Sequence, residues 1–128
     1  MTLDCSSLRR AVASLDEALA LERDAIVRDA VVQRFELTYE LCWKFIRRSL
    51  ADSDGSEAIE SLARRDLFRL AARRGLIGDA EPWFDYHRAR NESSHTYDER
   101  KADEVAQQAE RFAGDARALL LVLESRHA

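Results

Sequence analysis

The sequence contains few residues that interrupt a helix. One proline (Pro82) and four glycines occur in 128 residues. Proline and glycine are the least favourable residues in a helix interior, and strands are enriched in β-branched side chains, which are sparse here. Alanine, leucine, arginine and glutamate dominate instead. We therefore expect an all-α protein, and its length fits a single domain over residues 1–128.

Cysteines and long apolar runs are also scarce. Cys5 and Cys42 are too few for a disulfide framework, and Cys42 lies within the apolar run LCWKF, where we expect a small buried side chain. No apolar run approaches the ~20 residues that span a bilayer. The first ten residues, MTLDCSSLRR, lack the apolar centre of a signal peptide. These absences predict a cytoplasmic protein that makes no membrane contact.

Positive charge is concentrated in the middle of the chain. The net charge is −4, which argues against a dedicated nucleic-acid coat. Residues 64–90, however, carry seven basic and four acidic side chains, a local excess of +3, and every basic one is arginine. This excess is either an ordinary solvated helix face or a local site for an anion, because guanidinium groups match phosphate oxygens.

Apolar periodicity predicts four or five helices. They cover about residues 6–22, 24–51, 56–74 and 97–125, and a further helix before the last one should start at a cap formed by Asp79. Residues 51–57, ADSDGSE, are expected to form a loop. The stretch RRGLIGD should end the third helix, with Gly75 just beyond its last turn. Short connections favour antiparallel neighbours, so we expect an up-and-down four-helix bundle.

The second predicted helix is apolar over more than half of its circumference. One stripe begins at Val27 and ends at Phe45, and a neighbouring stripe begins at Val32 and ends at Leu50. A helix in a small bundle needs a narrower stripe. Either a partner chain covers the excess, or the third helix covers it.

The stretch RNESSHTYDE (90–99) gathers polar and titratable side chains. In one straight helix His95 would point ~140° away from Arg90. TYDE resembles a capping box, in which Thr96 caps the last helix and Glu99 occupies its third position. We therefore predict a break between about residues 92 and 96 that turns His95 back towards Arg90.

These side chains suit cleavage of RNA without a metal. Arg90 can hold a phosphate and stabilise the charge that develops on it, and His95 can transfer a proton near neutral pH. Asn91 and Ser94 are the expected supporting residues. The three histidines do not pair at a helical ligand spacing, so no metal and no cofactor is expected. A polar junction with no chemistry is the alternative, and His87 is expected to be structural or solvated.

The motif resembles the signature of the HEPN superfamily. Within that superfamily it is similar to bacterial nucleotidyltransferase substrate-binding proteins and HepT-type toxins, whose pattern Arg-x4-His-x-Tyr is matched by Arg90, His95 and Tyr97. RFELTYELCWKFIRRSL is similar to the second helix of that family, and RRGLIGDAEPWFDYHRARN to the stretch that leads into the motif.

The resemblance implies a HEPN-like four-helix bundle that forms a homodimer. It implies a toxin–antitoxin type module in which the partner, a minimal nucleotidyltransferase encoded nearby, is the antitoxin. Arg90 and His95 of two chains would line an endoribonuclease cleft with RNA as substrate, and AMPylation of Tyr97 by the partner would block it. The alternative within the family is a non-catalytic subunit that binds nucleotide or substrate for the partner enzyme.

Overall fold

The chain folds entirely into helices over the residues that the computed structural model describes, 3–95 and 97–127. The elements are α1 (Ser6–Leu19), α2 (Ala25–Asp54), α3 (Ser56–Glu60), α4 (Arg64–Arg73), α5 (Glu81–Glu92), the short 3-10 helix η1 (Ser93–His95) and α6 (Glu99–Arg126). The all-α prediction is confirmed. These ranges hold six α-helices rather than four or five, since the helix expected over 56–74 is divided at residues 61–63.

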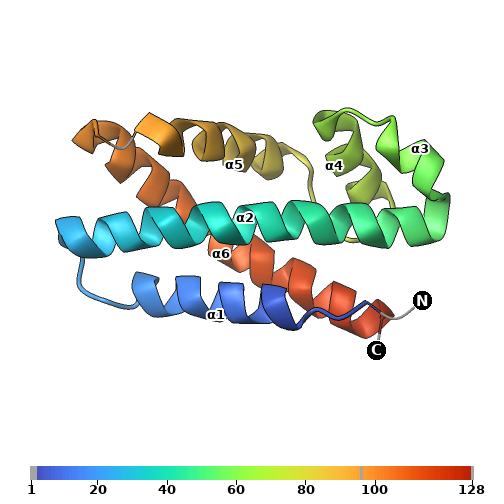
Figure 1. Cartoon of the computed structure of the whole chain (residues 1–128), viewed down its shortest axis with the longest axis horizontal. Coiled ribbons are helices and arrows are strands. Elements are labelled where there is room, and N and C mark those ends of the chain that lie inside the picture. Colours follow the sequence, from blue (N-terminus) through green and yellow to red (C-terminus); the bar gives the residue numbers. More distant parts are fainter. Residues whose placement is uncertain (1–2, 96, 128) are drawn as a thin grey trace.

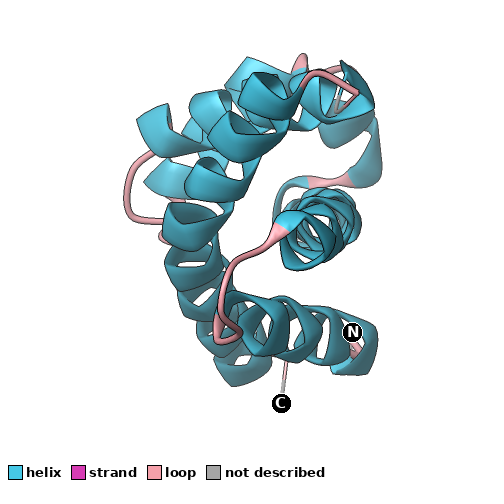
Figure 2. Ribbon diagram, turned by 90° about the vertical axis from the view of Figure 1, so that its left-hand side faces the viewer, coloured by secondary structure: helices cyan, strands magenta, loops and turns pink. Residues whose placement is uncertain are grey.

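The long helix α2 organises the molecule. Figure 1 shows α1 running antiparallel beside α2, α5 and α4 on its other side, and α6 crossing behind. Figure 2 looks along α2, and the other helices form an arc around it. One side of α2 consequently faces outward. None of the described helices has both the length and the apolar character needed to cross a membrane.

The core is centred on Phe112 of α6. Its ring meets those of Phe35, Tyr86 and Trp83 edge to face, with centroids 5.1, 5.2 and 5.8 Å away. This is a favourable aromatic geometry that adds to the burial of four large side chains. The alanines in the apolar stripe of α6 permit close approach to the neighbouring helices. This stripe is buried throughout and comprises Val105, Ala109, Phe112, Ala116, Leu119 and Leu123.

Both apolar stripes of α2 are covered within the chain. Thr38 of the first stripe donates a hydrogen bond to the carbonyl of Ala11 in α1 at 3.2 Å. On the second stripe, Trp43 packs edge to face on Phe68 of α4, with ring centroids 5.7 Å apart. The width of the apolar surface therefore gives no support for a partner chain. Leu37, which is 57% exposed on the outward side of α2, is a separate observation.

The helix ends show which turn predictions hold. Gly75 ends α4 with φ +74°, and Leu76 N–H donates to the Ala71 carbonyl at 2.9 Å, so the predicted helix stop is confirmed. The loop predicted over 51–57 is wrong, because α2 continues to Asp54 and Gly55 alone separates it from α3. Asp54 is held by Arg74 through a 2.6 Å ion pair, which anchors this last turn.

Candidate functional site

The candidate site lies at the junction of α5 and α6. Helix α5 ends at Glu92, η1 makes one tight turn, and α6 starts at Glu99, so the predicted break is confirmed. The predicted cap is wrong in its residue: Asp98 caps α6, and its Oδ1 accepts from the backbone N–H of Arg100 at 3.0 Å. Thr96 lies outside the described residues.

Arg90 is half-buried against α2 and is held there by two carboxylates. Its Nε donates to Glu40 Oε1 at 3.1 Å, and its Nη2 lies 3.8 Å from Glu36 Oε1. The buried Ser93 Oγ lies 2.8 Å from Glu36 Oε2 and 2.6 Å from the Arg90 carbonyl oxygen. Its single hydroxyl proton is donated to one or the other of these two acceptors. The guanidinium is therefore fixed in place, and the group it forms with both glutamates carries one net negative charge.

His95 and Tyr97 lie at the surface of the junction. His95 is exposed, Tyr97 is 86% exposed, and their ring centroids are 6.0 Å apart in an edge-to-face arrangement. Within residues 3–95 and 97–127, His95 makes no hydrogen bond to Arg90. The break thus brings the histidine beside the tyrosine, and a single chain does not complete the expected contact between arginine and histidine.

The two supporting residues stabilise the turn itself. Ser94 Oγ donates to the Asn91 carbonyl at 3.0 Å, and both residues are exposed. The Asn91 side chain also lines a cavity between α4 and α5. Asn91 is thus available to a ligand, whereas the hydroxyl of Ser94 is committed to the backbone.

Glu36 and Glu40 were not identified as site residues from the sequence. Their spacing of four places them on one face of α2, which is the available signal. The sequence does not show, however, that α5 lies along that face and supplies an arginine to it. Contacts between helices far apart in the chain are set by tertiary packing.

A second polar group joins α2, α4 and α5. Arg64 donates to the Tyr39 hydroxyl at 3.1 Å, and that hydroxyl lies 3.0 Å from His87 Nδ1. Burial raises the pKa of Tyr39 to about 12. Burial, followed by the positive charge of Arg64, lowers the pKa of His87. His87 is therefore half-buried and hydrogen-bonded rather than solvated.

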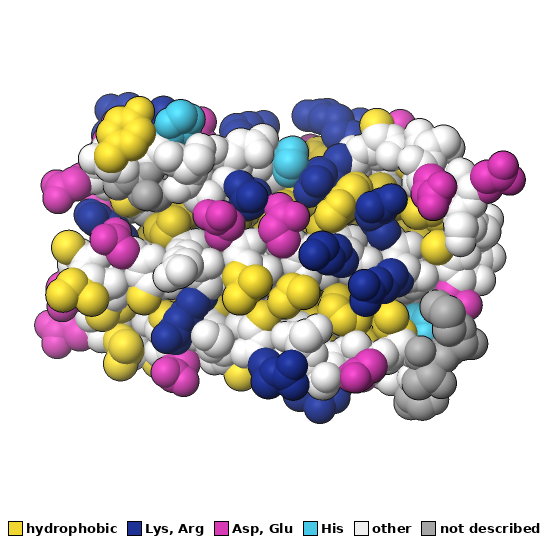
Figure 3. Space-filling model, in the orientation of Figure 1, with side chains coloured by type: hydrophobic (Ala, Val, Ile, Leu, Met, Phe, Trp, Pro, Cys, Tyr) yellow, Lys and Arg dark blue, Asp and Glu magenta, His cyan; other side chains and the backbone are white. Residues whose placement is uncertain are grey.

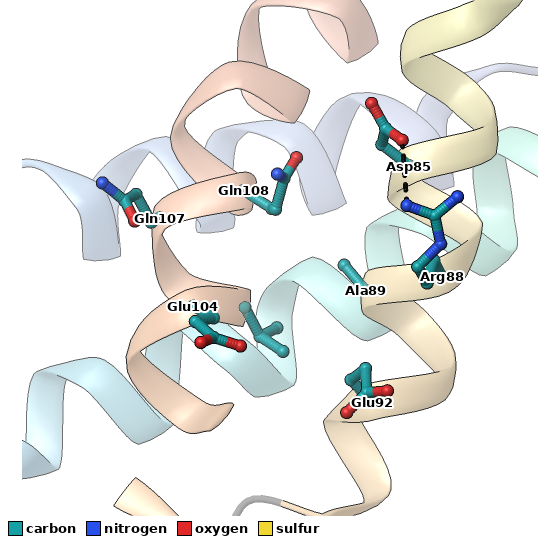
Figure 4. A pocket seen from close by; sticks show the side chains of 8 residues that line it. Asp85, Arg88, Ala89, Glu92, Glu104, Gln107 and Gln108 are labelled. Carbon is teal, nitrogen blue, oxygen red and sulfur yellow. Dashed lines mark hydrogen bonds and ion pairs between the residues drawn. The ribbon is translucent and has the colours of Figure 1, made fainter. Parts of the chain in front are cut away.

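Two cavities flank α5, and they differ in charge. Figure 4 shows the one between α5 and α6, of about 360 Å³, where Asp85, Glu92 and Glu104 contribute carboxylates and Asp85 accepts from Arg88. This lining opposes a polyanion.

On the face in Figure 3, cationic side chains gather over the C-terminal half of α2 and over α4. The described residues contain no cluster of three or more histidine, cysteine or acidic side chains able to hold a metal ion.

This all-helical fold with its polar junction belongs to a defined class. Residues 3–125 match the family described as nucleotidyltransferase substrate binding protein like, and the chain belongs to that family. Among curated proteins it is similar to the probable ribonuclease HepT of Haemophilus influenzae, with 37% identity over 109 residues, which cover 84% of this chain and 74% of that protein.

Two solved structures share the fold. A Haemophilus influenzae protein, described as having the fold of a substrate binding domain of a nucleotidyltransferase, is 30% identical with a TM-score of 0.87, over 94% of this chain and 99% of that one. A protein from Thermus thermophilus is 29% identical with a TM-score of 0.79, over 91% and 98% of the two chains. The HEPN-like fold predicted from the motif is thus confirmed.

Proposed function

We propose that this protein is the HEPN component of a bacterial toxin–antitoxin module and acts with a minimal nucleotidyltransferase encoded nearby. The observation that carries the proposal is the junction itself. It fixes Arg90 against α2 and exposes His95 and Tyr97 in a chain that is 37% identical to a probable ribonuclease. Family membership supports the association with a nucleotidyltransferase.

The proposed reaction is metal-independent cleavage of RNA. The ribose 2′-oxygen attacks the adjacent phosphorus, the bond from phosphorus to the 5′-oxygen breaks, and a 2′,3′-cyclic phosphate and a 5′-hydroxyl result. His95 accepts the proton of the 2′-hydroxyl, and a proton returns to the leaving 5′-oxygen. Arg90 binds the phosphate and stabilises the added charge of its transition state.

A homodimer would provide the missing contact between arginine and histidine. Glu36 and Glu40, which hold Arg90, flank the exposed Leu37 on the outward side of α2. A second copy seated on this side brings two junctions to one cleft, which is the geometry of an isologous dimer. One histidine can then act as base and the other as acid.

Cleavage is tested with purified protein and a defined RNA in the presence of EDTA. The wild type should cut the RNA, and His95→Ala should be slower by about 100-fold or more, in line with the loss of acid–base catalysis. Arg90→Ala should also lose activity. His127→Gln, which changes a histidine outside the junction, is the matched control. If RNA stays equally intact with the wild type and His95→Ala, the protein is not this nuclease.

Tyr97 is the proposed site of regulation by AMPylation. The partner would form a bond from the phenol oxygen to the α-phosphorus of ATP, with pyrophosphate leaving and the phenol proton released. Tyr39 and Tyr86 are fully buried, so Tyr97 is the accessible tyrosine. A bulky anion beside Arg90 and His95 would then exclude RNA.

Intact mass after co-expression with the partner tests this modification. The mass of the wild type should rise by the mass of one or more AMP groups, and the mass of Tyr97→Phe should stay that of the unmodified chain. An unchanged gain in Tyr97→Phe would exclude Tyr97 as the acceptor. Tyr39→Phe, which alters a buried tyrosine, should leave the gain intact.

A non-catalytic subunit that binds nucleotide or substrate for the partner enzyme is the second candidate. The pairing of Arg90 with two glutamates favours it, because this arginine is already neutralised in the single chain. Both candidates require a stable complex with the nucleotidyltransferase, so failure to co-purify would count against both. Cleavage of RNA that depends on His95 would exclude the second.

A further inference from the structure

The second cavity beside α5 is lined by cationic and aromatic side chains. It lies between α4 and α5, encloses about 220 Å³, and its lining includes Arg64, Arg65, Phe84, His87, Arg88 and Asn91. None of its lining residues is acidic. The cavity on the other side of α5 carries three carboxylates. An anion on this part of the surface is therefore drawn to the cavity between α4 and α5.

Two of its arginines keep their charge available. Arg64 lies on the Trp43 ring, 3.9 Å from its centroid, and Arg65 lies 4.6 Å from the centroid of Phe84. Neither forms an ion pair with a described carboxylate, in contrast to Arg90. A guanidinium stacked on a ring is held in one orientation. The N–H groups at its edge can still donate to phosphate oxygens, and the face turned away from the ring can stack on a base.

His87 contributes a polar ring to the same cavity. Arg64 can only donate, so the Tyr39 oxygen accepts from it, and this hydroxyl lies 3.0 Å from His87 Nδ1. The contact with Tyr39 holds the His87 ring in place beside the arginines of the cavity.

The size of the cavity limits what it can hold. Pockets that enclose a whole small ligand measure roughly 300–1,000 Å³, and 220 Å³ is below that range. A part of a longer molecule, such as one base with its phosphate, matches it better than a free nucleotide. Tyr39 and Glu40 are neighbours on α2, and they contact His87 and Arg90 respectively, so the cavity adjoins the candidate site.

We propose that the cavity between α4 and α5 binds one nucleotide of a single-stranded RNA next to the phosphate held at Arg90. Arg65 and Arg88 contact the phosphate, for which Arg88 gives up its solvent-exposed 3.4 Å pair with Asp85, and the base stacks against the guanidinium and ring surfaces. The choice of RNA as the ligand rests on the proposed function. The cavity is then a subsite that positions the strand, and its residues take no part in the chemical step.

Binding of a 2′-O-methylated single-stranded oligonucleotide, which cannot be cut, tests the subsite by fluorescence anisotropy. Arg65→Gln and Arg88→Gln should each weaken binding by about three- to tenfold. Each should also lower the slope of log affinity against log salt by about 0.7, the loss of one phosphate contact. Arg73→Gln is the matched control, since Arg73 is exposed on the same helix α4 but lies outside this cavity. AMP and ATP should compete weakly.

The outcomes separate this proposal from the proposed function. Equal affinity and equal salt slope in Arg65→Gln, Arg88→Gln and Arg73→Gln would overturn the subsite, even if His95-dependent cleavage is found. Weaker binding in the first two alone supports the subsite, even if no RNA is cut. Competition by AMP or ATP as strong as that by the oligonucleotide would overturn RNA as the occupant.

Discussion

Arg90 has an environment that opposes the role proposed for it. A phosphate must approach a guanidinium that already pairs with Glu40 at 3.1 Å and Glu36 at 3.8 Å. These carboxylates hold the side chain in one orientation, and they also repel an incoming anion. Their net effect on binding is therefore a balance between orientation and repulsion.

Replacing one of the two carboxylates should shift that balance. In Glu40→Gln one source of repulsion is lost while Glu36 still restrains Arg90, so RNA affinity at low salt should rise by about two- to fivefold, the scale of a partly exposed ion pair. Anisotropy with the uncleavable oligonucleotide measures it. Glu110→Gln, which removes a carboxylate paired with Arg23 at 3.2 Å, is the control and should change little. Lower affinity in Glu40→Gln would show that orientation dominates.

His87 should make the stability of the fold depend on pH. Burial and Arg64 lower its pKa in the folded chain, and Glu40 acts in the opposite direction. The unfolded chain keeps a pKa of about 6.5. As the pH falls below that value, the unfolded chain takes up a proton before the folded chain does. The free energy of unfolding therefore falls from pH 7.5 towards the pKa of folded His87.

Urea unfolding at pH 7.5 and 5.5 measures this contribution. The wild type should lose more stability between the two pH values than His87→Gln, because only the wild type has this proton uptake. His127→Gln controls for the removal of another histidine. An equal loss in the wild type and in His87→Gln would show that His87 is not protonated differently in the two states.

At the scale of elements, Gly55 decides how α2 and α3 meet. It is the single residue between them and has φ +94° and ψ +138°, a conformation that is costly for any residue with a Cβ. No atom lies within 4 Å of the position that a Cβ would take, so the cost of a substitution there is confined to the backbone. The angle between the two helices thus depends on this conformation.

Gly55→Ala should destabilise the protein by about 1 to 3 kcal/mol. Gly78→Ala is a matched control, since Gly78 also has open space around it and lacks a positive φ. That change should be neutral or stabilising by up to about 1 kcal/mol, because alanine restricts the unfolded chain. Chemical denaturation compares the two variants, and equal stability would contradict the strain assigned to Gly55.

The helices were predictable from the sequence where the signal is local. The stop at Gly75 and the break after Glu92 follow from residue types that act on their immediate neighbours. The polar composition of residues 51–54 was misleading. It marks exposure to solvent, whereas the packing of Ala51 against the core and the ion pair of Asp54 with Arg74 favour the helix. Tertiary contacts overrode a weak local preference there.

The site was predictable in part for the same reason. The motif spacing identifies Arg90, His95 and Tyr97 as candidates, and the structure fixes where each lies. The partners of Arg90 come from a helix about 50 residues earlier in the chain, and the subsite combines α4 with α5. No local pattern encodes these juxtapositions, which appear only once the helices are packed.

For the whole molecule, the outward side of α2 determines whether two junctions can meet. Cationic side chains gather near the C-terminal half of this helix in Figure 3. Leu37 is 57% exposed further towards its N-terminus. A dimer through this side would bury an apolar side chain that is otherwise in contact with water. It would also bring together Arg90 and the histidine of another chain.

Leu37→Glu should therefore separate the proposed dimer. Burying an unpaired carboxylate costs at least about 2 kcal/mol, which corresponds to roughly thirtyfold weaker association. Sedimentation velocity across protein concentrations measures the shift, and RNA cleavage should fall with the dimer fraction. Leu121→Glu, at a leucine that is 68% exposed on α6, should leave association and cleavage unchanged. A dimer that persists in Leu37→Glu but dissociates in Leu121→Glu would move the interface from α2 to α6.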